Sequence, residues 1–389
     1  MEPLRAALVG IGGMGASHRG LLETSDDFTF VACAERYLDR QAEAVADAKA
    51  HGAKVYGDYW EMIDEVEDLD VMVICTPHPW HAPYAIAALQ RGINVFVEKP
   101  VTVTVQEAMA LLDAKRQADK LVGVHFQYTS TGATKQLKEL LTTGALGKLV
   151  EVVAVMKWFR EESYYARNEW AGRRYVEGLP CWDGVLMNQA IHLVNSALQF
   201  STRKPEFGLP LHVQAETYRL HDIETEDLAC LRCDMDEAVL TIYATTCADK
   251  DNPIELYVRG EEGEAWWNVD EVKVRMKDGG EMILNDLPHG DDTHRNFAAC
   301  VRGAERGVYA PAEEAAKATI TVNAAYISAE RIPKIPAGDA GAIDALIDAA
   351  REKRLMFSEV PGAPKWTKAG EVVEIADVNS FDGLADDGA

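Results

Sequence analysis

A glycine-rich loop directly after the first apolar run constrains the fold of this chain more than any other feature. The run 4–9 has the composition of a buried strand, and a helical pattern over 16–23 follows the loop. The loop consists of Gly10, Ile11, Gly12, Gly13, Met14 and Gly15. In this GxGxxG spacing the first glycine makes a tight turn, the second admits a pyrophosphate, and the third lets helix and strand pack closely. A plain strand-to-helix turn is the alternative, but the position at the start of a βαβ pattern favours a phosphate-binding loop.

The first 125 residues alternate short apolar runs with helical patterns. We expect strands at 4–9, 28–34, 71–75, 94–97 and 121–124, and helices at 16–23, 38–50, 83–90 and 105–118. Strands that alternate with helices of this length form βαβ units with right-handed crossovers. The pattern therefore predicts an α/β fold, with a Rossmann-type doubly wound parallel sheet that binds a dinucleotide over 1–125.

Beyond about residue 130, strand patterns follow one another closely. They cover 148–159, 213–218, 228–234, 238–246, 254–259, 264–268 and 272–276, with helices near 185–200, 293–302 and 312–331. This order is typical of an α+β domain with a large, mostly antiparallel open sheet, which we place at 126–357. Clusters of Pro, Gly and Asp over 358–389 predict an extended arm or a partly disordered tail.

Charge and composition exclude several classes of partner. The chain has 63 Asp and Glu against 39 Lys and Arg, a net charge of −24. Nucleic acid and anionic membranes would be repelled, and no apolar run reaches the ~18 residues of a membrane span. The N-terminus has no signal-peptide layout, and the 7 scattered cysteines are typical of free thiols in a reducing compartment. We expect a cytoplasmic protein that binds neither nucleic acid nor membrane.

An acidic residue ends the second predicted strand, twenty positions after the last loop glycine. Glu35 stands where an acidic side chain accepts hydrogen bonds from the adenosine ribose and repels a 2′-phosphate, which favours NAD over NADP. Arg36 could instead hold that phosphate, so NADP stays open. The alternative is that these two residues are a solvated pair in a loop and have no role in cofactor binding.

Two further loops stand at the carboxyl ends of predicted parallel strands, where ligands of open α/β sheets bind. The first contains Cys75, Thr76, Pro77, His78 and His81, and the second is Glu98-Lys99-Pro100. With the glycine loop, these motifs at this spacing resemble the Gfo/Idh/MocA oxidoreductase family, which includes glucose–fructose oxidoreductases and inositol dehydrogenases. The likeness covers roughly residues 4 to 335.

The resemblance extends to a second signature that begins at Asp183 and ends at His192. Asn188 and His192 are four residues apart, which predicts that both project from one helix face. The sequence departs from the family at Asn188, where inositol dehydrogenases have a carboxylate, and at Asn195, where an aspartate is frequent. Asn can orient a substrate hydroxyl but cannot take its proton, so the substrate expectation moves toward other sugar-oxidising branches.

Alcohol oxidation requires a base for the O–H proton and a hydride acceptor that faces the C–H. By resemblance, Lys99 lies near a cationic nicotinamide, and two like charges ~4 Å apart cost about 4 kcal/mol at an effective dielectric of 20, which favours the neutral amine. We assign Lys99 as proton acceptor or relay, His192 as base or hydrogen-bonding partner, and Asn188 as substrate orienter. The sequence leaves open which of Lys99 and His192 takes the proton.

The same resemblance assigns further residues to the cofactor. Glu98 would help to hold Lys99 and the nicotinamide ribose. Thr76, Pro77 and His81, with Cys75 and His78 beside them, would line the cofactor. Taken singly, each of these residues, Lys99 and His192 included, more often has an ordinary structural role, and it is their joint spacing, as in the family, that favours the functional interpretation.

An aromatic and arginine-rich run precedes the second signature. It contains Trp158, Arg160, Tyr164, Tyr165, Arg167, Trp170, Arg173 and Arg174. Aromatic faces stack on sugar C–H surfaces and arginines hold hydroxyls or carboxylates, so we expect a carbohydrate pocket for an acidic sugar or a glycoside, with a surface loop over packed aromatics as the alternative.

We expect no metal site. Cys230 and Cys233 form a CxxC within a strand pattern, where positions three apart point to opposite faces. His289, His294 and the acidic pair 291–292 also resemble ligands, but Asp292 at a helix start is more typical of an N-cap.

These features predict an NAD-dependent dehydrogenase that oxidises a secondary hydroxyl of a sugar, glycoside or polyol. A redox-neutral, NAD-dependent hydrolase or lyase that cleaves a glycoside by oxidation and elimination is the alternative, and a sugar-sensing regulator without Lys99 chemistry is the third. By analogy with the family, the antiparallel sheets would pair into a homodimer or homotetramer.

Overall fold

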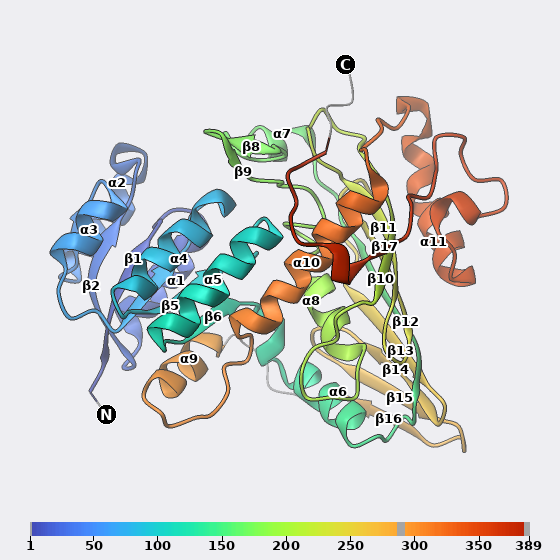
Figure 1. Cartoon of the computed structure of the whole chain (residues 1–389), viewed down its shortest axis with the longest axis horizontal. Helices are drawn as coiled ribbons and strands as arrows, with labels where there is room; N and C mark the ends of the chain where they lie inside the picture. Colours follow the sequence, from blue (N-terminus) through green and yellow to red (C-terminus); the bar gives the residue numbers. More distant parts are fainter. Residues whose placement is uncertain (1, 286–291, 385–389) are drawn as a thin grey trace. The chain divides into compact units, whose positions relative to one another are not determined.

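The structure, a computed structural model, describes residues 2–285 and 292–384. The chain forms two compact units (Figure 1). The first comprises Met1–Thr102, Glu107–Phe126 and Asp292–Glu313, and the second comprises Val103–Gln106, Gln127–Asp291 and Glu314–Ala389. The first unit thus also takes in Asp292–Glu313, a segment far along the chain that lies outside the expected range of 1–125.

The first unit contains the predicted parallel sheet. Its strands are β1 (Leu4–Val9), β2 (Phe28–Ala34), β3 (Lys54–Tyr56), β4 (Val71–Ile74), β5 (Asn94–Glu98) and β6 (Val122–His125). They lie in the order β3-β2-β1-β4-β5-β6, and every pair is parallel. The order reverses between β1 and β4, so the loops that follow these strands lie side by side at the ligand-binding edge. The doubly wound Rossmann-type sheet is confirmed.

Apolar residues from sheet and helices form the core of this unit. Its helices are α1 (Met14–Thr24), α2 (Ala42–Ala50), α3 (Tyr59–Glu65), α4 (His81–Gln90), α5 (Val105–Ala118) and α9 (Thr293–Val301). Leu8, Val73 and Phe96 from three strands pack with Leu22 of α1 and Phe297 of α9. Burial of large apolar side chains at about 25 cal/mol per Å² is the main stabilising contribution here.

The second unit is built on a nine-stranded sheet. Its strands are β7 (Leu149–Lys157), β10 (His212–Tyr218), β11 (Leu228–Asp234), β12 (Val239–Thr245), β13 (Glu255–Gly260), β14 (Gly263–Trp267), β15 (Val272–Met276), β16 (Glu281–Leu284) and β17 (Val373–Glu374). The order is β16-β15-β14-β13-β7-β12-β11-β10-β17, in which only β7 and β12 pair in parallel. The predicted large, mostly antiparallel sheet is confirmed.

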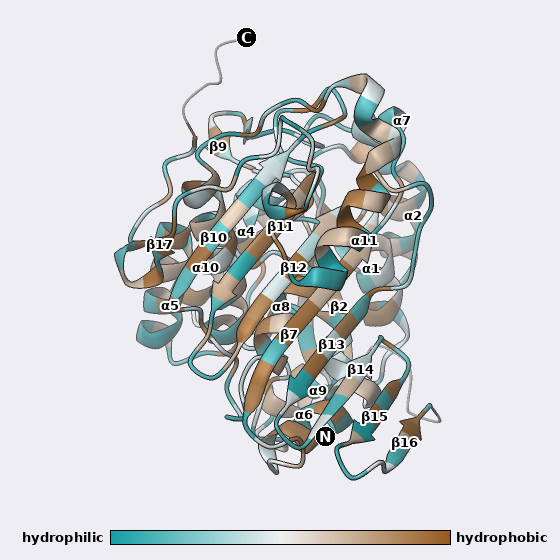
Figure 2. Cartoon of the chain, turned by 90° about the vertical axis from the view of Figure 1, so that its right-hand side faces the viewer, coloured by the Kyte–Doolittle hydropathy of each residue, from teal (hydrophilic) through white to brown (hydrophobic). Residues whose placement is uncertain are grey.

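Helices cover both faces of this sheet. In Figure 1, α6 (Gly132–Thr142), α8 (Ile191–Phe200) and α10 (Ala312–Ala329) lie on one side of the strands and α11 (Ile343–Lys353) lies on the other. Figure 2 faces the second side and shows α11 across the strands. Ile343 and Ile347 of α11 are buried in one cluster with Val155, Leu228 and Tyr243 of the sheet.

The segment after residue 358 is an ordered arm as far as residue 384, whereas 385–389 lie outside the described residues. Val373 pairs with Val213 at the edge of the sheet. Further on, Phe381 packs against the rings of Trp182 and Tyr326. Among the described residues, no helix has both the length and the apolar character needed to cross a membrane.

Candidate cofactor and substrate site

The glycine loop has the backbone geometry that a phosphate cradle needs. Gly10 adopts φ +81°, and a Cβ added there would lie 2.3 Å from the carbonyl oxygen of Cys75. A Cβ on Gly15 would lie 2.0 Å from the Gly10 carbonyl oxygen. Helix α1 then begins at Met14 without a side-chain cap and without an acidic residue in its first turn. Its N-terminal N–H groups and its dipole therefore favour an anion at this loop.

Glu35 lies directly beside this loop. Its Oε2 accepts a hydrogen bond from the backbone N–H of Ile11 at 3.2 Å, and its Oε1 accepts one from Tyr37 at 2.9 Å. The Arg36 guanidinium is 5.6 Å from the ring centroid of Tyr37. The carboxylate is thus fixed at the end of β2 and close to the phosphate loop, where a ribose hydroxyl would be recognised.

The loop after β4 is tied to the loop after β5 through His81. This ring is completely buried, with Nδ1 2.7 Å from the carbonyl oxygen of Pro100 and Nε2 2.8 Å from that of Thr76. Burial lowers the pKa of His81. The ring of His78 lies 5.9 Å from it. His81 therefore holds two predicted cofactor-lining loops together, and burial raises the pKa of the nearby Cys75 thiol, which keeps it protonated.

Glu98 is the centre of a buried cluster with three histidines. Its Oε1 is 2.9 Å from His18 Nε2 and 2.6 Å from His125 Nδ1, and His18 Nδ1 is 2.8 Å from His294 Nε2. All four residues are at most 5% exposed. Burial by itself would raise the pKa of Glu98, but the hydrogen bonds and charges of His125 and His18 hold it well below its usual range. The carboxylate is therefore ionised.

This cluster anchors the residue with the predicted catalytic amine. The second oxygen of Glu98, Oε2, accepts a hydrogen bond from the backbone N–H of Lys99 at 3.1 Å. Lys99 itself is only partly buried. The backbone of Lys99 is thus held by a charged group that three histidines fix from within the unit.

The other predicted catalytic residues, Asn188 and His192, lie in the second unit. The structure there differs from one of the predictions. Helix α8 begins at Ile191, so Asn188 precedes the helix instead of sharing a face with His192. The chain turns here because the N–H of Asn188 bonds the carbonyl of Gly184, and Ala190 bonds that of Val185. The expectation of one helix that carries both side chains is wrong.

Asp183 fixes this turn. Its Oδ1 accepts a hydrogen bond from Asn188 Nδ2 at 2.6 Å, and its Oδ2 accepts one from the backbone of Gly172 at 2.9 Å. His192 is 7% exposed, and its ring centroid lies 4.9 Å from that of Tyr128. A polar turn held by a buried carboxylate therefore leads into the helix that bears His192.

The aromatic and arginine-rich run divides into two groups. Tyr164 points toward the turn, because its hydroxyl accepts a hydrogen bond from Gln189 Nε2 at 2.9 Å, and Tyr165 bonds Thr246 at 2.7 Å. Two arginines are ion-paired instead, Arg160 with Asp251 at 3.0 Å and Arg173 with Glu224 at 2.7 Å. Trp158 and Trp170 are half-buried. The other two arginines contact backbone carbonyls and aromatic rings: Arg167 those of Tyr164, and Arg174 the Glu224 carbonyl and the Trp182 ring. The run thus contributes aromatic surface and two arginines that contact no carboxylate in these interactions.

A second cluster joins His221, Asp227 and Cys247 at neighbouring strand ends. The Asp227 carboxylate is buried and accepts hydrogen bonds from the backbone N–H and Nδ1 of His221, at 2.8 and 2.9 Å. Burial lowers the pKa of His221, but the hydrogen bond and charge of Asp227 outweigh it, so the net shift is upward. Burial raises the pKa of the Cys247 thiol. We interpret this cluster as an ion pair beside a protonated thiol.

Some of the residues that resemble metal ligands in the sequence lie outside the described residues. His289 and the first residue of the acidic pair lie there. His294 belongs to the Glu98 cluster, and Asp292 is the N-cap of α9 but makes no side-chain capping hydrogen bond. Cys230 and Cys233 are both buried and free.

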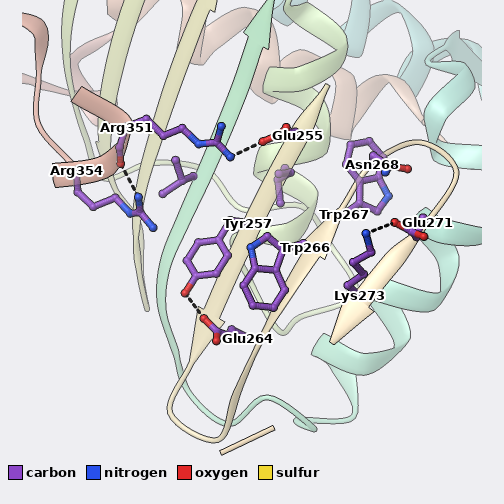
Figure 3. Close-up of a pocket in the computed structure, with 12 residues that line it drawn as sticks. Glu255, Tyr257, Glu264, Trp266, Trp267, Asn268, Glu271, Lys273, Arg351 and Arg354 are labelled. Atoms are coloured by element: carbon purple, nitrogen blue, oxygen red, sulfur yellow. Dashed lines mark hydrogen bonds and ion pairs between the residues drawn. The ribbon is translucent and has the colours of Figure 1, made fainter. Parts of the chain in front are cut away.

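None of the predicted site residues lines the groove of about 490 Å³ on the α11 side of the sheet. Figure 3 shows Tyr257 and Trp266 along its floor, with Arg351 directed toward Glu255. The exposed fraction of Trp266 is 37%. The groove is therefore an aromatic surface with charged borders, separate from the predicted catalytic residues of this unit.

Two family models match the chain. Residues 4–126 match the oxidoreductase family with an NAD-binding Rossmann fold, and residues 134–266 match the C-terminal domain of the same family. The chain belongs to the Gfo/Idh/MocA oxidoreductase family. The resemblance drawn from the glycine loop and Glu98-Lys99-Pro100 is thereby confirmed.

Characterised members of the family are similar to parts of this chain. D-glucoside 3-dehydrogenase of Escherichia coli is 32% identical over 154 residues, 39% of this chain and 43% of that protein. Levoglucosan dehydrogenase of Pseudarthrobacter phenanthrenivorans is 28% identical over 51% of both chains. An inositol dehydrogenase homologue of Azotobacter vinelandii, solved with NAD⁺, has a TM-score of 0.73 at 19% identity and covers 85% of this chain and 96% of its own. The matches to the curated relatives span about half of their length or less.

Several residues around the site escaped the sequence reasoning. His18 and His125 were not predicted, His294 was considered only as a metal ligand, and Asp183 was noted only as the start of a signature. The three histidines lie more than one hundred residues apart in the sequence. The spacing of His18, one turn after the glycine loop on α1, was the available signal for the first. The other two positions depend on how the strands and α9 pack.

Proposed function

We propose that this protein is an NAD-dependent dehydrogenase that oxidises a secondary hydroxyl of a sugar, glycoside or polyol. The observation that carries the proposal is the edge of the parallel sheet. The strands β1, β4 and β5 are neighbours, and the glycine loop, the Thr76–His81 loop and Lys99 follow them. Membership in an NAD-binding oxidoreductase family supports this assignment.

The residues of this edge fit NAD. The N–H groups of the loop from Gly10 to Gly15 and the start of α1 would hold the pyrophosphate. Glu35, fixed beside Ile11, would accept hydrogen bonds from the ribose and repel a 2′-phosphate, which favours NAD over NADP. When bound, the nicotinamide ring supplies a hydride acceptor.

The chain's own residues move the proton and orient the alcohol. In this proposal Lys99 or His192 takes the hydroxyl proton as a hydride leaves the carbon that bears the hydroxyl, so the alcohol loses one hydride and one proton, which is two electrons and two protons in all. Asn188, held by Asp183, orients a second hydroxyl. Glu98 keeps the Lys99 backbone fixed while this happens.

The substrate class follows from the surfaces near the turn. Half-buried aromatic residues and a tyrosine hydroxyl bonded to Gln189 suit sugar C–H faces and hydroxyl groups. Arg160 and Arg173 are already ion-paired, and Arg167 and Arg174 already contact backbone carbonyls and aromatic rings. We therefore favour a neutral sugar, glycoside or polyol over an acidic one. The relatives named for D-glucoside and levoglucosan oxidation support this choice.

Steady-state assays test the proposal and its alternative together. The purified protein is examined for bound nicotinamide cofactor, and NADH absorbance is followed over a panel of sugars, glycosides and polyols. Accumulation of NADH supports the dehydrogenase, whereas bond cleavage without net NADH would favour the redox-neutral hydrolase or lyase. Binding of sugars without turnover would favour a regulator.

A lysine variant tests the catalytic assignment. Lys99→Ala should abolish turnover and retain cofactor binding, because the glycine loop and Glu35 are untouched. Lys49→Ala, on the exposed surface of α2, is the matched control and should behave as the wild type. Near-normal turnover of the Lys99 variant would overturn the assignment.

We also propose that the protein forms a homodimer or homotetramer through the groove in Figure 3. Exposed Trp266 and Val239 on the α11 side, with Ile283 on the edge strand β16, supply apolar area for a second copy. Light scattering of Trp266→Glu, which should give monomers, tests this.

We place the protein in the cytoplasm, since its 7 cysteines, all free in the structure, suit a reducing compartment.

A further inference from the structure

Glu226 is a completely buried carboxyl group next to the turn that leads into α8. Its side chain is 0% exposed. Its Oε1 accepts two hydrogen bonds, one from the backbone N–H of Leu186 and one from the hydroxyl of Tyr326, both at 2.9 Å. Its backbone carbonyl accepts a third from Val185 at 2.8 Å. Glu226 thus contacts two consecutive residues of the turn between Asp183 and His192.

The two oxygens of this carboxyl group are unequal. Oε2 is buried and has no hydrogen-bond partner within residues 2–285 and 292–384. A carboxylate divides its charge between both oxygens and requires donors at each, whereas a carboxylic acid has one carbonyl oxygen that accepts and one hydroxyl. Because a charged oxygen left without donors in the interior costs more free energy than a neutral hydroxyl left without an acceptor, two donors on Oε1 and no partner at Oε2 among the described residues favour the neutral acid.

The charged groups around Glu226 do not neutralise it. Asp227 is committed to His221 and to backbone N–H groups, and Asp183 adds a second negative charge nearby. Arg174, a cation close enough to act on Tyr326, donates to the backbone carbonyl of Glu224 and lies over the ring of Trp182. Burial raises the pKa of Glu226 to about 8, against the opposing effect of its hydrogen bonds from Leu186, its own backbone and Tyr326.

The carboxyl group also shapes the turn directly. A Cβ added to Gly184 would lie 2.1 Å from Glu226 Oε2, so the backbone of the turn packs flush against the acid. The rings of Trp182 and Phe381 lie against Tyr326 at 4.9 and 5.5 Å and close this region to solvent. The arm that follows residue 358 therefore helps to exclude water from Glu226.

We propose that Glu226, kept as a neutral acid by its burial and anchored by Leu186 and Tyr326, is a positioning residue that fixes the turn bearing Asn188 and the entry to the His192 helix, and that loss of its proton releases the turn. The catalytic part of this inference rests on the proposed function. The protonation state and the coupling to the turn do not, because they can be measured without substrate.

The first test measures the acid itself in the full-length protein. Infrared difference spectra should contain a protonated-carboxyl band that disappears as the pH rises through about 8 and that is missing from Glu226→Gln. Amide hydrogen exchange over 183–190 should accelerate above that pH in the wild type beyond the intrinsic increase, and Glu226→Gln should lack this acceleration. Glu281→Gln, on the exposed strand β16, is the matched control and should behave as the wild type.

The second test uses the pH profile of catalysis. Glu226→Gln keeps an oxygen for both donors, so it should fold and retain most of the activity at pH 7 while losing the decline in kcat with a midpoint near 8. Tyr326→Phe removes a donor that stabilises the ionised form, so its midpoint should move to higher pH. A role confined to packing would leave both profiles unchanged.

The outcomes separate this inference from the proposed function. Persistence of the band change and of the exchange change in Glu226→Gln would overturn the inference, whatever the enzyme oxidises. Failure to oxidise any sugar, with both signals lost in the variant, would leave the positioning of the turn established and would overturn the dehydrogenase proposal instead.

Discussion

Each unit of this protein buries one glutamate next to predicted catalytic residues, and the two are treated in opposite ways. Glu98 has His18 and His125 on one oxygen and the Lys99 backbone on the other, so it is held as an anion. Glu226 has neutral donors on one oxygen only and is held as an acid. Burial is nearly the same, at 5% and 0% exposure. Protonation is therefore decided by the partners of each carboxyl group rather than by depth.

The largest expected difference between them is in the pH dependence of stability. The pKa of Glu226 in the folded protein, about 8, lies above the ordinary value of 4.5. The free energy of unfolding should therefore fall as the pH rises from 4.5 to 8, because the unfolded state releases this proton more readily. A shift of that size corresponds to about 5 kcal/mol. Relative to wild type, Glu226→Gln should therefore become more stable across this window and keep a constant advantage above it. Urea unfolding at several pH values measures this. A difference in unfolding free energy between variant and wild type that does not change with pH would contradict the comparison.

The contribution of Glu98 to stability should depend on pH with the opposite sign. Its folded pKa lies well below the ordinary value, so its contribution is present above about pH 4.5 and is lost as the pH falls. Removing one partner of a buried ion pair costs about 3–5 kcal/mol. Glu98→Gln should lose this much at neutral pH, lose less in acid, and lose turnover with it because the Lys99 backbone is released. Urea unfolding against Glu61→Gln, on exposed α3, checks this; a cost that does not depend on pH would contradict it.

Local sequence predicted the part of the site that local motifs build. The glycine loop, the Glu35 position and the carboxyl-end placement of Lys99 follow from strand-loop-helix patterns that occupy consecutive residues. Strands such as Phe28–Ala34 and Leu228–Asp234 match their predicted bounds for the same reason, since apolar runs bounded by turns decide them.

The remaining parts depend on contacts between distant segments. The stretch from Asp183 to His192 does not by itself indicate a turn before Ile191, because two of the residues that hold the turn, Gly172 and Glu226, lie outside the stretch. Short strands such as β3 and β17 have too few residues for a periodic pattern and are stabilised by the sheets they join. The opposite states of Glu98 and Glu226 likewise require knowledge of their partners.

A histidine variant tests how the anion at Glu98 is maintained. His125→Phe keeps an aromatic ring against Phe96 and His18 but removes the donor at 2.6 Å from Glu98 Oε1. Loss of one hydrogen bond to a buried charged group should cost about 1–3 kcal/mol of unfolding free energy. Turnover should fall less than in Glu98→Gln, because His18 still holds the carboxylate. Equal losses in the two variants would mean that His18 contributes nothing to the anion.

The smallest effect is expected where a carboxylate is paired at the surface. Arg173 and Glu224 form an ion pair at 2.7 Å, but their side chains are 55% and 44% exposed, so water and salt screen the attraction. Such pairs contribute about 0–1 kcal/mol. Arg173→Ala should therefore leave unfolding free energy within that range. Its effect on KM separates the substrate classes: little change with neutral sugars agrees with an arginine already committed to Glu224, whereas a selective loss for anionic sugars would show that Arg173 leaves its partner to bind substrate.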